Sequence, residues 1–385
     1  MKTNLKCILG ALALGLTGCA NHSAPTLQGE LSGIEADSLS VLHISNEWYQ
    51  QMSKIDRIPV QNGKFTYSLD SIKSGLYALM VDEGKGPQFV KLFLEPTDTK
   101  VRIEKDKNNL LKASSTGGTL TDKYSQFQAD LYRVGNMQAL DSLDNLFYAA
   151  RAKNDMEEMS RIKESSMPYY TESSENKKNF IAKLQEQEGQ SSFGLYLYYS
   201  YQFQNHNFNT LEEIQEIEDY LEALPAEAKA LDYYSLMKKS LDRFKKCAVG
   251  ALAPSIEGVD KDGKAVSLKD FQGKYVLVDF WSSGCTWCRL ETPNLLSVYN
   301  TFKDKNFTVL GVSSDRSKEK WLQAVEEDKS YWNQIVLPRE KTNEIYDAYC
   351  IVGIPHIILV GPDGKILAKE LRGEDIVKTV TQFVK

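Results

Sequence analysis

Two cysteines separated by two residues, Cys285 and Cys288, are the side chains of this sequence best suited to chemistry. An apolar strand pattern precedes them and a helical pattern follows, so we expect the pair at a strand-to-helix junction. At a helix N-terminus, free N–H groups and the helix dipole favour a thiolate, lowering the pKa of the first cysteine from about 8.5 toward neutrality. Cys285 is therefore the predicted nucleophile. Cys288, one turn further on, is predicted to close the disulfide and to resolve a mixed disulfide.

Two carboxylates lie on either side of this pair. Asp279 belongs to the strand pattern before the cysteines, and Glu291 to the helical pattern after them. Burial near the site would raise the pKa of a carboxyl group, which could then accept the proton of the resolving thiol. Asp279 and Glu291 are thus candidate catalytic residues. The alternatives are that Asp279 only satisfies the strand end and that Glu291 is a solvated helix residue.

The C-terminal residues, 248–385, alternate strand and helix patterns, which predicts an α/β domain with a mixed sheet. The expected strands are 276–281 and 307–313, the expected helices are 286–302, 317–328 and one from 374 onward, and a hairpin is expected from 357–361 and 365–371.

This domain resembles the thioredoxin superfamily and, within it, the TlpA/ResA-like branch. Asp279 and Trp281 precede Cys285 by six and four residues, as the buried Asp and the Trp of thioredoxin precede its first cysteine. Further matches are Glu291-Thr292-Pro293 in the branch's Glu-x-Pro position, Val352-Gly353-Ile354-Pro355 in place of the cis-proline loop, and the hairpin turn Pro362-Asp363-Gly364-Lys365. The resemblance implies a thioredoxin-like fold and a thiol:disulfide interchange activity.

The resemblance also implies a surface that binds substrate. A cis peptide before Pro355 would expose the backbone of Ile354 to an incoming strand of substrate, and isoleucine there, as in thioredoxin, favours a disulfide reductant. His356 replaces the usual threonine and either tunes the thiolate or faces solvent. The intervening pair Thr286-Trp287 leaves the redox potential open. The implied substrate-binding residues are Trp281, Trp287, Ile354, Pro355 and His356.

Two other cysteines, Cys247 and Cys350, lie in or beside this domain. Each is expected to be a buried, small apolar residue, with a third redox thiol as the alternative.

Two further regions precede the thioredoxin-like domain. Residues 27–112 carry short strand patterns and predict a small, antiparallel, β-sandwich-like domain with a type I′ turn at Asn62-Gly63. Residues 112–119 have the composition of a linker, and 113–247 are assigned to a helical region. Its tyrosine-rich stretch, 193–203, either packs helices together or forms a ligand platform. By resemblance these regions are the N-terminal extension of lipoprotein thioredoxins.

The N-terminus has the pattern of an export signal. Lys2 and Lys6 precede an apolar run too short to span a bilayer, which predicts a signal peptide at 1–18. Leu16-Thr17-Gly18-Cys19 resembles the bacterial lipobox, which implies lipidation of Cys19 and a linker over 19–26; an ordinary signal peptide is the alternative. By resemblance to the lipoprotein sorting rules of Gram-negative bacteria, Ala20-Asn21 after the cysteine, in place of an acidic residue, favours the outer membrane. We therefore expect a periplasm-facing protein anchored to a membrane by lipid.

Several other functions are weighed against this one. A net charge of −6 without a cluster of basic and aromatic residues argues against nucleic-acid binding. A lone Cys-x-x-Cys supplies half of a metal site, so we expect neither a metal nor any cofactor besides the redox-active disulfide. A peroxidase of the peroxiredoxin type remains an alternative, although Val278 stands where its pattern has proline. Another is a partner-binding lipoprotein with an auxiliary redox domain.

The expected partners follow from the same resemblance. Protein disulfides would be the substrates, apocytochrome c thiols being one option, and a membrane thiol-transfer protein of the CcdA or DsbD kind would return electrons to the Cys285–Cys288 pair.

Overall fold

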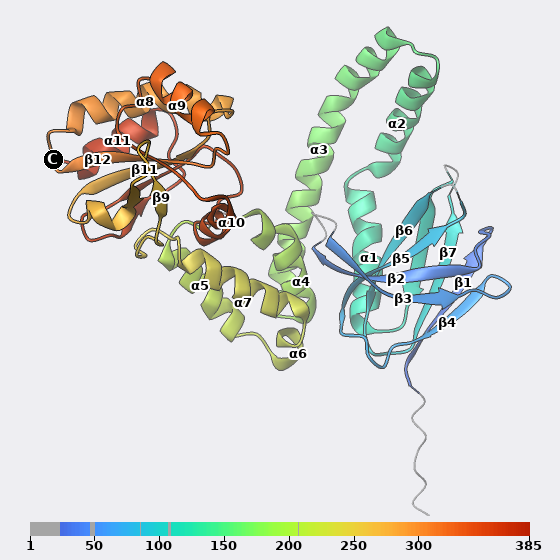
Figure 1. The fold of residues 1–385 in the computed structure, drawn as a ribbon. Helices are drawn as coiled ribbons and strands as arrows, with labels where there is room; N and C mark the ends of the chain where they lie inside the picture. The colour runs from blue at the N-terminus through green and yellow to red at the C-terminus, as the bar shows by residue number, and fades with distance from the viewer. Residues whose placement is uncertain (1–23, 47–50, 85, 107–108, 207) are drawn as a thin grey trace, which may run out of the picture. The chain divides into compact units, whose positions relative to one another are not determined.

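A computed structural model describes residues 24–46, 51–84, 86–106, 109–206 and 208–385 (Figure 1). The predicted signal peptide, Cys19 and the first part of the 19–26 linker lie outside these residues. The described chain forms two compact units, one comprising residues up to Ile44 and Met52–Phe127, the other Ser45–Gln51 and Gln128–Lys385. Each unit is described by itself.

The first unit contains two four-stranded sheets whose apolar faces share one core. One sheet has the order β4-β1-β7-β8, with β1 (Thr26–Ser32), β4 (Lys64–Ser68), β7 (Thr99–Lys105) and β8 (Leu111–Thr116). The other has the order β3-β2-β5-β6, with β2 (Ser38–Asn46), β3 (Gln51–Pro59), β5 (Gly75–Asp82) and β6 (Pro87–Leu94). Along β7, buried and exposed residues alternate, because successive side chains of a strand point to opposite faces. The predicted β-domain is confirmed.

The Asn62-Gly63 turn forms, but it connects the two sheets. Both residues have positive φ, 52° and 71°, and Gln61 and Lys64 exchange backbone hydrogen bonds of 2.9 and 3.0 Å. The strand that follows, β4, pairs with β1, whereas β3 belongs to the other sheet. A turn motif therefore predicts the local bend but not which strand pairs beyond it.

Two details of the first unit differ from the prediction. β1 and β7 are parallel, so one pair departs from the antiparallel pattern. Residues 111–116, assigned to the domain end and the linker, form β8, which pairs with β7 along its length. Their serines, threonine and alanine look like a linker, yet backbone pairing at a sheet edge does not require large apolar side chains. The compact unit then continues to Phe127, beyond the predicted boundary.

The middle of the chain is helical, as predicted. It contains α1 (Thr119–Val134), α2 (Met137–Ala152), α3 (Met156–Glu188), α4 (Ser192–Tyr201), α5 (Leu211–Glu222), α6 (Ala226–Lys229) and α7 (Asp232–Lys245). Thr210 and Glu213 form a capping box that starts α5. Phe193 and Tyr196 of the tyrosine-rich stretch are at most 2% exposed, so this stretch packs helices together and offers no open ligand platform.

The C-terminal part is a seven-stranded mixed sheet of order β10-β9-β13-β12-β11-β14-β15. Its elements are β9 (Glu257–Val259), β10 (Ala265–Ser267), β11 (Tyr275–Trp281), α8 (Thr286–Phe302), β12 (Phe307–Ser313), α9 (Lys318–Glu327), β13 (Asn333–Val336), α10 (Arg339–Ala348), β14 (His356–Val360), β15 (Ile366–Ala368) and α11 (Glu374–Phe383). β12 is parallel to β11 and β13, and β14 is antiparallel to β11. The predicted α/β fold with a mixed sheet is confirmed. The short strands β9, β10 and β13 and the helix α10 were not predicted.

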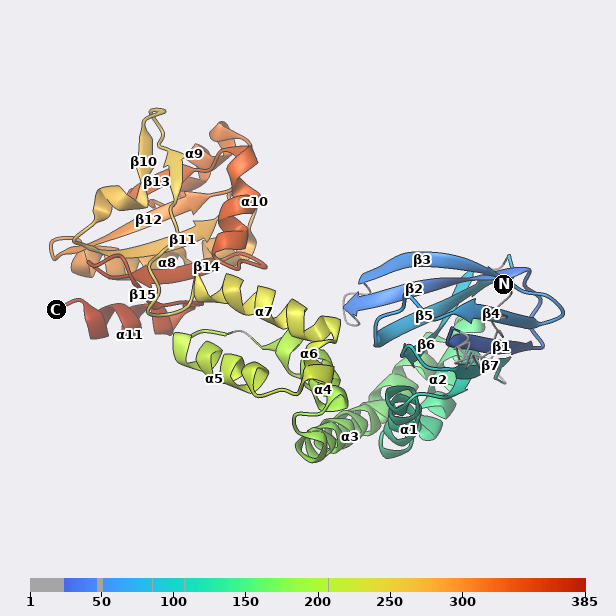
Figure 2. The ribbon, with the colours of Figure 1, turned by 90° about the horizontal axis from the view of Figure 1, so that it is seen from below.

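Helices cover both faces of this sheet (Figures 1 and 2). Leu277 of β11 packs with Leu295 of α8 and Ile376 of α11 on one face. Val278 of the same strand packs with Ile345 of α10 on the other. Burial of both faces explains why β11 is a nearly continuous apolar run. Asp279 interrupts that run on the α8 face, just below the strand-to-helix junction.

Candidate functional site

The Cys285–Cys288 pair is a disulfide at the start of α8. Cys285 is the N-cap residue, and its Sγ accepts a hydrogen bond of 3.1 Å from the backbone N–H of Cys288. Cys288 is only 3% exposed, whereas Cys285 is half-buried. After reduction, the same N–H and the helix dipole would stabilise a thiolate on Cys285. The geometry thus distinguishes an accessible sulfur from a shielded one.

The loop that presents Cys285 is fixed by a neighbouring strand end. Asp315, just after β12, accepts hydrogen bonds from the backbone N–H of Ser283 at 2.8 Å and from its hydroxyl at 2.6 Å. Ser313 donates a further bond of 2.7 Å to the same carboxylate. No sequence motif indicated Asp315, because its role depends on the pairing of β11 with β12.

The cis-proline loop lies directly against the disulfide. The peptide bond between Ile354 and Pro355 is cis, and the carbonyl oxygen of Ile354 lies 3.7 Å from Cys285 Sγ. Arg372 donates a hydrogen bond to the carbonyl oxygen of Pro355 and another, of 2.7 Å, to that of Leu371. Arg372 therefore links this loop to the segment before α11, a role that no sequence motif indicated.

Asp279 is a buried carboxyl group whose pKa is strongly perturbed. It is 5% exposed, and its Oδ1 has no hydrogen-bond partner among the described residues. Burial raises its pKa to about 7; the positive charge of Arg372 opposes the rise, and the negative charge of Glu291 adds to it. The side chain points to the same face of β11 as Trp281, which packs with Cys288. A carboxyl group with a pKa near 7 is thus buried on the face of β11 that also carries Trp281, the residue that packs with Cys288.

Glu291 is half-buried and also has a structural task. Its Oε2 accepts hydrogen bonds of 2.9 Å from the backbone N–H of Gly373, the N-cap of α11, and of 3.0 Å from Asn294 Nδ2. The carboxylate therefore connects α8 to α11, and it acts on Asp279 through charge. It is not the freely solvated helix residue of the alternative interpretation.

Three of the five predicted substrate-binding residues, Trp281, Pro355 and His356, are buried, which corrects the expectation of direct side-chain contact. Trp281 is 4% exposed, and its Nε1 donates a bond of 3.2 Å to Gln334. His356 is 6% exposed and packs 5.9 Å from the Phe280 ring, so it does not face solvent. Burial lowers the pKa of His356 to about 4, helped by the charges of Lys369 and Arg372, so its imidazole is neutral at pH 7. The resemblance supplied the positions, but not the directions in which these side chains point.

Exposed apolar side chains lie on both sides of the disulfide. Trp287 is 73% exposed and Leu290 61%, and they share one face of the first turns of α8. On the other side, Val352 of the cis-proline loop is 99% exposed. Of the five predicted contact residues, Trp287 and the Ile354-Pro355 backbone are the ones placed at the accessible sulfur.

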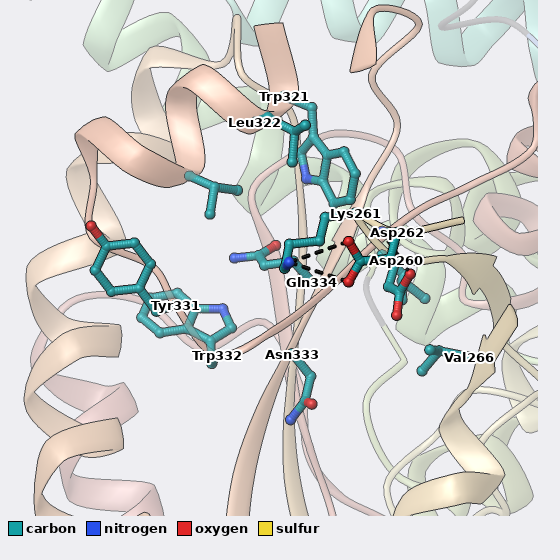
Figure 3. A pocket seen from close by; sticks show the side chains of 12 residues that line it. Asp260, Lys261, Asp262, Val266, Trp321, Leu322, Tyr331, Trp332, Asn333 and Gln334 are labelled. Atoms are coloured by element: carbon teal, nitrogen blue, oxygen red, sulfur yellow. Dashed lines mark hydrogen bonds and ion pairs between the residues drawn. The ribbon is translucent and has the colours of Figure 1, made fainter. Parts of the chain in front are cut away.

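A separate cavity of about 310 Å³ lies between α9, β13 and the β9–β10 turn (Figure 3). Trp321 and Trp332 line it, with Asn333, Gln334, and the charged residues Asp260 and Lys261. Neither cysteine of the disulfide lines this cavity. It adjoins the redox site through Gln334, which accepts the bond from Trp281, and through Trp321, which packs in one apolar cluster with Trp281 and Cys288.

The membrane anchor predicted at Cys19 lies outside the described residues. Within the part of the chain that the structure describes, no helix combines the length and the apolar character required to cross a bilayer.

The site and the regions around it resemble known proteins. Residues 249–369 match the AhpC/TSA family, and residues 26–124 match a domain of unknown function, DUF4369. Thiol-disulfide oxidoreductase ResA of Bacillus cereus is 27% identical over 152 residues, covering 40% of this chain and 86% of that protein. ResA of Bacillus subtilis is 29% identical over 118 residues, or 31% of this chain and 64% of that protein. The crystallised thioredoxin domain of a Bacteroides vulgatus thiol-disulfide oxidoreductase is 61% identical, covers 36% of this chain and 99% of its own, and has a TM-score of 0.35.

Proposed function

This chain is a TlpA/ResA-like thiol-disulfide oxidoreductase, and from that premise we propose that it reduces disulfide bonds in protein substrates outside the cytoplasm. In the reduced protein, the Cys285 thiolate attacks one sulfur of a substrate disulfide, and the other substrate sulfur leaves as a thiolate. Cys288 then attacks Cys285 Sγ, which releases the second substrate thiol and closes the Cys285–Cys288 bond. Two electrons pass to the substrate. The proposed cycle uses no cofactor besides the Cys285–Cys288 pair.

The observation that carries the proposal is the unequal environment of the two sulfurs. Cys285 is half-buried beside the Ile354 carbonyl, whereas Cys288 is 3% exposed and packed with Trp281. An incoming substrate therefore meets Cys285 first, and Cys288 acts only after a mixed disulfide has formed. The backbone of the loop before Pro355 offers an edge to which an extended substrate segment can pair.

The proton of Cys288 needs an acceptor during resolution, and Asp279 is the proposed one. Its pKa of about 7 lets it take up a proton and return it near neutral pH. Glu291 assists by raising that pKa and by connecting α8 to α11. Replacing Asp279 with Asn is expected to slow release of a trapped substrate by about 100-fold, the scale of a lost general base. An unchanged rate would remove Asp279 from the proton path.

Insulin reduction by dithiothreitol, followed by turbidity, tests the activity itself. The wild-type chain should accelerate precipitation of the insulin B chain, and C285S should not. Asp304→Asn, a change of an exposed residue after α8 and away from the disulfide, serves as the control and should retain the activity.

The reduction potential of the Cys285–Cys288 couple tests the direction of electron flow. Equilibration with glutathione buffers gives this potential, and a difference of 30 mV corresponds to about 1.4 kcal/mol. We expect a value at or below the roughly −220 mV of glutaredoxin-type reductants. A value near −120 mV, that of a strong oxidant, would contradict the reductant proposal.

The compartment and the electron donor form part of the same proposal. The export signal and the lipobox at Cys19 support a periplasm-facing protein anchored to a bacterial membrane, with the outer membrane as the favoured site. In an oxidising compartment, a membrane thiol-transfer protein of the CcdA or DsbD kind would have to re-reduce the pair. Labelling with radioactive palmitate, lost in C19S, tests the anchor.

A peroxidase is the second candidate, favoured by the match of residues 249–369 to the AhpC/TSA family. Against it, Val278 is a buried residue of β11 at the position where the peroxiredoxin pattern has proline, and Cys285 is already paired with Cys288. Consumption of hydrogen peroxide at a rate matching insulin reduction would favour the peroxidase.

A further inference from the structure

A second pair of cysteines lies on the side of the sheet covered by α10. Cys247 follows α7 at the end of the helical region, and Cys350 follows α10 in the thioredoxin-like domain. Both belong to the same apolar cluster, and their side chains hydrogen-bond to each other. Because 103 positions separate them along the chain, the sequence predicted two separate, small buried residues.

The backbone at Cys350 is the second observation. Its φ is +55°, in the left-handed region that glycine or asparagine usually occupies after a helix. The N–H of Cys350 bonds to the Asp347 carbonyl at 3.1 Å and that of Ile351 to the Tyr346 carbonyl at 2.8 Å, so Cys350 is the central residue of a Schellman motif. A residue needed only to fill space would more easily be glycine there. A side chain kept at a position of unfavourable backbone geometry indicates a specific task.

The segments that carry the two cysteines are fastened to each other by other contacts. Arg243 in the last turn of α7 forms an ion pair of 3.2 Å with Asp347 in the last turn of α10. Just after Cys247, the backbone of Gly250 and Ala251 exchanges hydrogen bonds of 2.8 and 2.9 Å with Ile366 of β15. These contacts hold the segment that carries Cys247 to the domain that carries Cys350.

The electrostatic surroundings suit thiol–disulfide exchange. The hydrogen bond with Cys350 lowers the pKa of Cys247 to about 7, burial opposes this, and the charges of Lys369 and Arg243 add to the lowering. The same bond raises the pKa of Cys350. Cys247 is 2% exposed and Cys350 is half-buried, so an external reagent reaches Cys350 first and Cys247 supplies the resolving thiolate.

We propose that Cys247 and Cys350 form a second disulfide, which covalently fastens the end of the helical region to the segment leading into the cis-proline loop. Cys350 passes its proton to the Cys247 thiolate as it attacks an oxidant disulfide R–S–S–R, and the released R–S⁻ then takes up that proton from Cys247. Cys247 then attacks Cys350 Sγ and releases the second R–S⁻, which is protonated in turn. Two electrons pass from the cysteine pair to the oxidant, for which oxidised glutathione suffices as a reagent.

This bond would differ in role from the Cys285–Cys288 disulfide. The first pair has a half-exposed sulfur at a helix N-terminus and exchanges with substrates. The second has no sulfur at a helix N-terminus, is largely enclosed by packed side chains, and closes a long chain loop between two parts of the protein. Cys350 lies five residues before Pro355, so the bond would hold the base of the loop against which substrate binds.

The test uses the chain with Cys7, Cys19, Cys285 and Cys288 changed to Ser, so that of six cysteines only Cys247 and Cys350 remain. A protease recognition sequence is inserted in the exposed β9–β10 turn between Asp262 and Gly263. After treatment with oxidised glutathione and cleavage, we expect one full-length band on a non-reducing gel and two fragments after reduction. The matched variants C247S and C350S should give two fragments in both gels. Two fragments from the parent protein without reductant would overturn the proposal.

The inserted protease site could disturb folding, so thiol groups are also counted in the same cysteine variant without the insertion. After denaturation, mass spectrometry should find two alkylated cysteines before oxidation and none after it. Two alkylated cysteines after oxidation would also overturn the proposal. Because both measurements lack Cys285 and Cys288, their outcome is independent of the insulin-reduction assay.

Discussion

Replacing the buried Asp279 with Asn should change how stability depends on pH. The pKa of this carboxyl is about 7 in the folded protein, against a usual value of 3.8, so folding favours its protonated form. The resulting stabilisation is fully present below pH 3.8 and is lost as the pH rises through about 7. Between pH 5 and pH 8.5, this single group should lower the free energy of unfolding by about 3 kcal/mol. Asparagine cannot ionise, so D279N should lack this loss.

Urea unfolding at the two pH values, followed by tryptophan fluorescence with the disulfides kept oxidised, measures the difference. Four of the five tryptophans, Trp281, Trp287, Trp321 and Trp332, lie in the thioredoxin-like domain, so the signal reports mainly on that domain. Asp304→Asn, which removes an exposed carboxyl after α8, is the matched control and should keep the wild-type pH dependence. Equal losses in the wild type and in D279N would refute the assignment of a raised pKa to Asp279.

The remaining predictions concern the redox site. In C288S, a mixed disulfide between Cys285 and insulin should accumulate and be visible on non-reducing gels, because no resolving thiol remains; its absence would contradict the assigned order of attack. The resolution rate should rise as Asp279 deprotonates near pH 7, and Arg372→Leu should move this midpoint to higher pH, since the arginine charge opposes the raised pKa. Glu291→Gln should move the midpoint to lower pH, because it removes a negative charge near Asp279. Stopped-flow measurements of the resolution rate against pH test both variants. Midpoints that shift in the same direction in the two variants would exclude the opposite effects of Arg372 and Glu291 on the Asp279 pKa.

Local sequence patterns determined the core of the site. The strand-to-helix junction around the two cysteines and the helix 286–302 follow from the spacing of apolar residues. Both patterns lie in one continuous stretch of sequence, so no contact between distant residues is needed to predict them. Resemblance added the buried Asp279 and the loop before Pro355. In the structure, the carboxyl is buried on the strand that precedes the disulfide, and the Ile354 carbonyl lies against Cys285.

Tertiary structure alone decided the features that join distant segments. Resemblance placed Trp281 and His356 among the substrate-binding residues and left open whether His356 faces solvent, but packing between the sheet and its helices buries both side chains. The contact of Arg372 with the cis-proline loop joins residues from different elements, and so does that of Cys247 with Cys350. Such contacts leave no periodic pattern in the sequence, because they depend on which strands pair and which helices cover them. The Cys-x-x-Cys motif is local and was visible in the sequence, whereas the groups that set its proton chemistry came together only through folding.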